Sequence, residues 1–152
     1  SKISYMKNSF YLLATFFLIA CSGVDAPPKS TWSEEQISEK KQLVNDLMAV
    51  HDSTMEYMDE IHLSIEELNS FKLRSNADSS ILDSAIGLLE VADESMMQWM
   101  RTYREPKDTV DFAEARKYLL GQKMAIEQVE KQTDEAISFS SKIVEYVTDS
   151  IH

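Results

Sequence analysis

The sequence predicts an all-α protein of three long antiparallel helices, which follow an N-terminal targeting segment and a short linker. Two observations predict this fold class. Apolar residues recur at alternating steps of three and four, which is the spacing of amphipathic helices in a bundle. The 152-residue chain also contains only three glycines and three prolines, too few for the many tight turns of a β-sandwich or β-barrel. Its length fits a single domain.

The chain begins with a segment that has the organisation of a signal peptide. Lys7 supplies a short basic region, and residues 10–20 form an apolar stretch that is too short for a stop-transfer helix. We expect residues 1–20 to be removed from the mature protein. Residues 1–5 precede the first methionine, so we interpret them as an upstream extension.

Residues 18–21, with the sequence LIAC, resemble the lipobox of bacterial lipoproteins, in which a small residue precedes a cysteine. The resemblance implies that Cys21 is lipidated, becomes the first mature residue and attaches the chain to a membrane. An ordinary secretory signal with a chance cysteine is the alternative. Ser22 resembles the outer-membrane sorting pattern of enteric bacteria. We therefore expect a lipid-anchored domain in the cell envelope, in the periplasm or at the cell surface.

The charge of the chain restricts its partners. It carries 15 basic and 26 acidic residues, for a net charge of -11. Nucleic-acid binding needs clustered basic charge, so we expect no nucleic-acid partner. An acidic surface is not drawn to anionic lipid either, so the acyl chains would have to provide the membrane attachment.

Residues 21–31 are predicted to be the lipidated cysteine and an extended linker, and residues 32–152 to be the helical domain. Capping-box patterns at 31–34 and 33–36 mark the start of the first helix. Because no glycine or proline follows until Gly87, we expect one unbroken helix to about residue 73. Trp32 is placed to staple its N-terminus, and Tyr57 lies off its apolar face. The predicted apolar seam, flanked by Leu47, Ile61 and Leu68, comprises Val44, Met48, His51, Met55, Met58, His62 and Ile65.

A polar stretch at 74–80 separates this helix from the second, which we expect to end before Pro106. The third helix is expected to begin near Asp108 or Thr109, and its second half to be only partly covered because small and polar residues become commoner there. The seam of the second helix comprises Leu82, Ala85, Leu89, Ala92, Met96, Trp99 and Tyr103. That of the third comprises Phe112, Ala115, Leu119, Gln122, Ile126, Val129, Thr133, Ala136, Ser140, Ile143 and Val147.

The sequence favours a binding role over catalysis. It contains no Gly-rich phosphate loop and no G-x-S-x-G, H-E-x-x-H or C-x-x-C-H motif. The carboxylates lie on predicted solvent-exposed faces, so no acid/base pair is apparent. We therefore expect a non-enzymatic envelope lipoprotein that binds or scaffolds another envelope component and needs no cofactor. Apolar residues near the C-terminus would support self-association, namely Ile143, Val147 and Ile151.

Histidine and methionine side chains suggest an alternative function. Folding the first two helices together places His51 level with Met100, and Met55 level with Met96, in one layer with Trp99. Thioether and imidazole ligands suit a cuprous ion, and periplasmic copper chaperones have a similar set of ligands near a tryptophan. Ordinary core packing by methionine is the competing interpretation. A His/Met pair can also hold haem iron, although three helices leave little room for a porphyrin.

Two segments carry a further resemblance. Residues 51–58 resemble an H-D-x-x-M-x-x-M pattern, and residues 96–103 resemble M-M-x-W-M-x-x-[YF]. Both patterns are similar to those of small, uncharacterised lipoproteins of Bacteroidota that are often called viral A-type inclusion proteins. The resemblance implies an envelope location and a helical fold, and it implies no particular activity.

Overall fold

The computed structural model describes residues 30–74 and 79–151, which form four α-helices. No strand occurs among these residues, so the predicted all-α class is confirmed. The signal-peptide segment, Cys21 and the linker up to residue 29 lie outside the described residues. The helices are α1 (Glu34–Met55), α2 (Met58–Arg74), α3 (Ser79–Thr102) and α4 (Phe112–Ile151).

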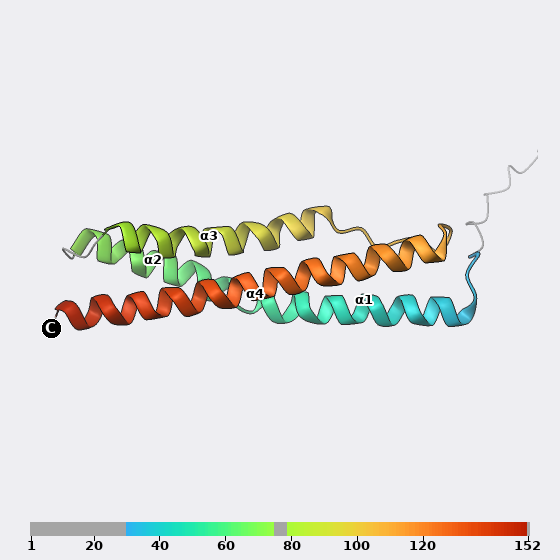
Figure 1. The fold of residues 1–152 in the computed structure, drawn as a ribbon, viewed down its shortest axis with the longest axis horizontal. Coiled ribbons are helices and arrows are strands. Elements are labelled where there is room, and N and C mark those ends of the chain that lie inside the picture. The colour runs from blue at the N-terminus through green and yellow to red at the C-terminus, as the bar shows by residue number, and fades with distance from the viewer. Residues whose placement is uncertain (1–29, 75–78, 152) are drawn as a thin grey trace, which may run out of the picture.

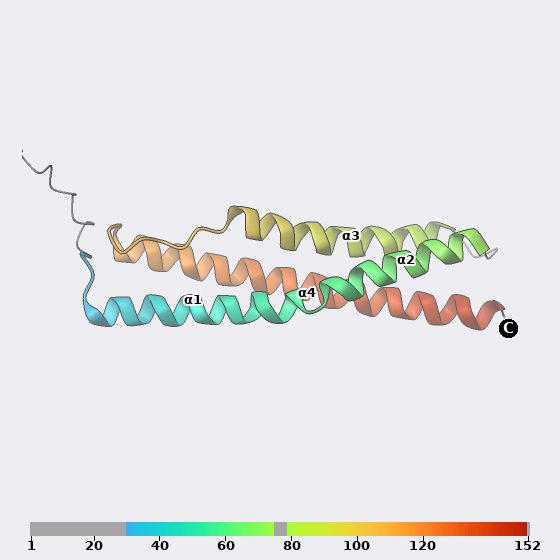
Figure 2. The same ribbon diagram turned by 180° about the vertical axis from the view of Figure 1, so that it is seen from behind.

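The helices form an elongated rod (Figure 1). The longest helix, α4, follows the rod along its length, and α1 and α2 lie one after the other beside it. The view from behind shows α3 folded back on α2 (Figure 2). Since α3 is shorter than α4, it covers only part of the rod. None of the described helices is long and apolar enough to cross a membrane.

Side-chain caps determine where α1 and α4 begin. The Ser33 hydroxyl accepts from the Gln36 amide at 3.2 Å, and the Gln36 side chain accepts from the Ser33 amide at 2.9 Å, so the predicted capping box at 33–36 is confirmed. The start predicted for the third helix, near Asp108, is wrong by several residues. The Asp111 carboxylate accepts from the Glu114 amide at 3.0 Å, which sets the start at Phe112.

The prediction of one unbroken first helix is wrong, because the chain turns at residues 56–57 between α1 and α2. The hydroxyls of Ser53 and Thr54 both donate to the Val50 carbonyl, at 3.0 and 2.8 Å. Such back-bonding competes with the helical ladder and bends helices. The Tyr57 amide then bonds to the Thr54 carbonyl, three residues back. The break therefore lies directly after two back-bonded hydroxyl residues and involves neither glycine nor proline.

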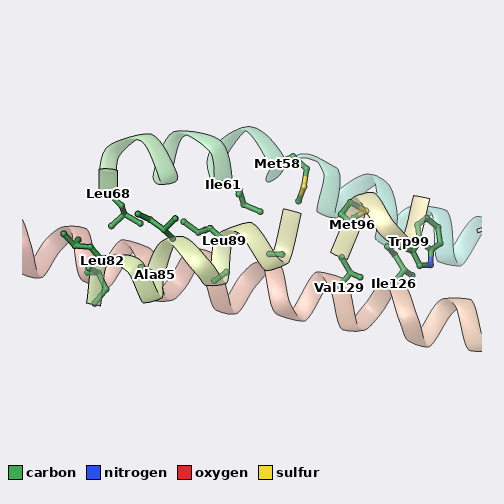
Figure 3. Packing of buried hydrophobic residues seen from close by; sticks show 14 of the residues in the cluster. Met58, Ile61, Leu68, Leu82, Ala85, Leu89, Met96, Trp99, Ile126 and Val129 are labelled. Atoms are coloured by element: carbon green, nitrogen blue, oxygen red, sulfur yellow. The ribbon is translucent and has the colours of Figure 1, made fainter. Parts of the chain in front are cut away.

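The buried core runs between α2, α3 and α4 and continues along α1 (Figure 3). The predicted α3 seam is confirmed from Leu82 to Trp99, all of whose members are buried. Of the seam predicted for the first helix, Met58 is buried as predicted, but His62 is exposed. The predicted flanking residues Leu47, Ile61 and Leu68 are buried together with Thr54. The face that packs on the core therefore lies about one position away from the predicted seam.

The predicted seam stays buried along the second half of α4, which contradicts the prediction that this half is only partly covered. Thr133, Ala136 and Ser140 lie in contact with the core elements, where small side chains allow close helix approach. Ile143 and Val147 are also buried in the same core, so they do not form the exposed self-association surface that the sequence suggested. The N-terminal parts of α1 and α4 have no α3 beside them (Figure 1).

Candidate functional site

A row of four aromatic rings connects α1, α3 and α4. The His51 ring lies 5.5 Å from the Trp99 ring, centroid to centroid, and is tilted by 34°. Trp99 stacks on Tyr103 at 4.9 Å, and Tyr103 stacks on Tyr118 at 6.4 Å. The predicted placement of His51 in the layer of Trp99 is therefore confirmed.

Asp52 orients the His51 ring. The His51 side chain is only 15% exposed, and its Nδ1 lies 2.8 Å from Asp52 Oδ1. A carboxylate only accepts hydrogen bonds, so Nδ1 donates in this contact. Nε2 is the second ring nitrogen and the atom that would bind a metal. Metal-binding histidines commonly have this arrangement, in which a carboxylate orients the ring from behind.

The methionines of the predicted layer border the same core. Met96 is fully buried and lies beside Trp99 (Figure 3), and Met55 and Met100 are half-buried against the core cluster. Met58 at the start of α2 is buried in the same cluster. The candidate residues His51, Met55, Met96 and Met100 thus all belong to or border one continuous core. This packing suits both thioether ligation and ordinary gap filling by methionine.

Two polar atoms of the aromatic row have no hydrogen-bond partner within the described part of the chain, although both are buried. They are Trp99 Nε1 and the Tyr103 hydroxyl. Burial, with smaller contributions from the negative charge of Glu105 and from the neighbouring Tyr118, raises the pKa of Tyr103 to about 12. A buried donor without an acceptor costs about 1–3 kcal/mol. The spacing of residues along the chain does not predict this feature, because the missing partners depend on the neighbouring helices.

His62, which the sequence placed on the apolar seam, lies instead at the surface between α2 and α3. Its side chain is 59% exposed, and its Nε2 lies 3.2 Å from Asp93 Oδ1. Across residues 30–74 and 79–151, no group of three or more His, Cys, Asp or Glu side chains is arranged to hold a metal ion. No family model, curated protein or solved structure matches the chain.

Proposed function

We propose that the chain is a lipid-anchored protein of the bacterial envelope, whose helical rod binds or positions another envelope component without catalysing a reaction. The observation that carries this proposal is the lipobox-like sequence that ends at Cys21. Only residues 22–29 separate this cysteine from the described part of the chain. The favoured location is the outer membrane, in line with Ser22 after the cysteine.

The shape of the rod supports a positioning role. The described chain begins at the end where α1 and α4 start, and the end of α2, the start of α3 and the end of α4 lie at the opposite end (Figure 1). The 40 residues of α4 extend over about 60 Å at 1.5 Å per residue. A lipid at Cys21 would therefore leave the far end of the rod clear of the membrane. Leu73 near the end of α2 is 88% exposed, which offers an apolar contact to a partner there.

Metabolic labelling with a fatty acid tests the anchor. The wild-type chain should incorporate the label and should be found in the membrane fraction. Cys21→Ala should lose both the label and membrane retention, because it removes the only thiol in the chain. Ser22→Ala is the matched control, since it changes the neighbouring residue and leaves the cysteine. Absence of label in the wild type, or label that persists in Cys21→Ala, would contradict the proposal.

A second candidate function is cuprous-ion binding by His51, Met55, Met96 and Met100. The observation that favours it is His51, whose Nδ1 bonds to Asp52 while its ring lies against Trp99 in the methionine-bordered core. Thermal melts under reducing, anaerobic conditions test it. A ligand at a hundredfold excess over its Kd stabilises the folded state by about 2.7 kcal/mol. An unchanged melting temperature with cuprous ion would reject this function.

A further inference from the structure

The two residues that precede the capping box contact a distant part of the chain. The Thr31 amide and hydroxyl both lie 3.2 Å from the Asp108 carbonyl oxygen, to which they donate. The Trp32 indole N–H donates to the Val110 carbonyl at 2.7 Å. The indole also packs edge-to-face on Phe112, with ring centroids 5.3 Å apart. These contacts bury Trp32 to 8% exposure, although it lies only two residues into the described chain.

The segment that they contact is the connection 103–111, which joins α3 to α4. It passes over the part of the rod that α3 no longer covers (Figure 2). A cleft of about 620 Å³ lies between this connection and α1, lined by Trp32, Ile37, Lys40 and residues 105–109. The connection therefore covers an open space instead of packing into a filled core.

Few other contacts hold the connection over the cleft. At its beginning, Tyr103 stacks between Trp99 and Tyr118, and the Arg104 amide donates to the Tyr118 hydroxyl at 2.9 Å. In its middle, Glu105, whose side chain is half-exposed, pairs with Lys40 on α1. The Val110 amide bonds within the connection itself, to the Lys107 carbonyl at 3.3 Å. Residues 108–110 are thus held mainly by Thr31 and Trp32.

We propose that residues 31–32 form a strap that closes the 103–111 connection over this cleft, and that the strap and connection open together while the rod stays folded. The physical reason is that the core does not depend on the strap. Its fully buried residues begin at Leu47 on α1, and the Glu39–Arg116 pair joins α1 to α4 independently. Segments with few buried contacts open locally at lower free energy than the global fold.

The position of the strap gives it a mechanical role. Residues 31–32 make the first tertiary contacts of the described chain. A pulling force on the preceding linker would therefore act on the strap before it reached α1. This force, but not the strap itself, rests on the proposed lipid anchor. Opening would expose the apolar faces of Trp32 and Phe112 at that end of the rod.

Trypsin cleavage of the full-length chain after Lys107, an exposed residue of the connection, measures this opening. Cleavage of a transiently open segment follows the population of its open form. Trp32→Ala should speed cleavage after Lys107 at least about tenfold, because it removes both the hydrogen bond and the ring contact. Trp32→Phe keeps a ring but lacks the N–H, so it should have an intermediate effect. Cleavage after Lys131, within α4, should not change in either variant.

Two outcomes would overturn the proposal. One is an unchanged rate after Lys107 in Trp32→Ala. The other is an equal rise in the cleavage rate after Lys107 and after Lys131, in both Trp32 variants and in the milder Thr31→Val. Such a result would mean that the strap is part of the global fold. The assay contains no lipid and does not depend on acylation. Failure of the fatty-acid labelling would therefore leave its result intact.

Discussion

Arg116 on α4 pairs with Glu39 on α1 at a separation of 77 positions, and Ser53 Oγ lies 3.5 Å from Glu130 Oε1 at the same separation. A constant offset between two helices requires that they run parallel without slipping in register. The offset is a multiple of seven, so equivalent heptad positions of α1 and α4 lie side by side. The two helices thus form a parallel pair, against which α3 lies antiparallel.

The first prediction concerns the core. Leu89→Asp should unfold the rod or lower its free energy of unfolding by more than about 3 kcal/mol, since Leu89 is fully buried and a carboxylate there would have no partner. Glu66→Ala, on the exposed face of α2, should change it by less than about 0.5 kcal/mol. Urea unfolding followed by circular dichroism measures both. Similar losses for the two variants would mean that Leu89 does not face the core.

A second prediction concerns Thr133, whose buried hydroxyl has no hydrogen-bond partner in the described part of the chain. Thr133→Val keeps the shape of the side chain and removes the unsatisfied group, so it should stabilise the protein by about 1 kcal/mol. Thr54→Val is the matched control, because the buried Thr54 hydroxyl donates to Val50 and its removal should bring no such gain. An equal gain at both positions would show that the missing partner is irrelevant.

A third prediction follows from Tyr103, whose pKa burial raises to about 12, from 10.0. The folded state therefore favours the neutral hydroxyl. This preference contributes fully to the stability of the folded state below about pH 10, and the contribution is lost as the pH rises through about 12. Tyr103→Phe has no proton to lose, so its unfolding free energy should fall less over this interval than that of the wild type. Tyr146→Phe, at an exposed site, should follow the wild type.

A fourth prediction separates a copper site from ordinary packing. Met96→Leu and Met100→Leu conserve volume, so each should change the stability of the metal-free protein by less than about 1.5 kcal/mol. If these residues are ligands, both swaps and His51→Leu should reduce the shift in melting temperature that cuprous ion causes. Exposed Met124→Leu is the control and should keep the full shift. A shift that survives all the core substitutions would reject this choice of ligands.

The sequence determined the helical class and the core faces of α3 and α4. From Leu82 to Trp99 and from Ala115 to Val147, apolar residues recur at steps of three and four on one helical face, and the apolar members of this face are buried. The capping box at Ser33 was equally readable, because it depends on residues three apart in the chain. In the candidate site, the sequence predicted that His51 and Trp99 lie at the same height along the bundle, because the first two predicted helices fold back on each other through a short polar stretch. The proposed lipidation of Cys21 also rests on local sequence alone.

Only the tertiary structure decided how α1 and α2 face the core. Their apolar stripe is wide, and it includes methionine and histidine, which are stable on either side of the boundary between core and solvent. The neighbouring helices therefore selected Leu47 and Ile61 for burial and left His62 at the surface. The unpartnered Trp99 and Tyr103 atoms and the strap of Thr31 and Trp32 arise in the same way. Each depends on groups tens of residues away, whose approach the spacing of a single helix does not specify.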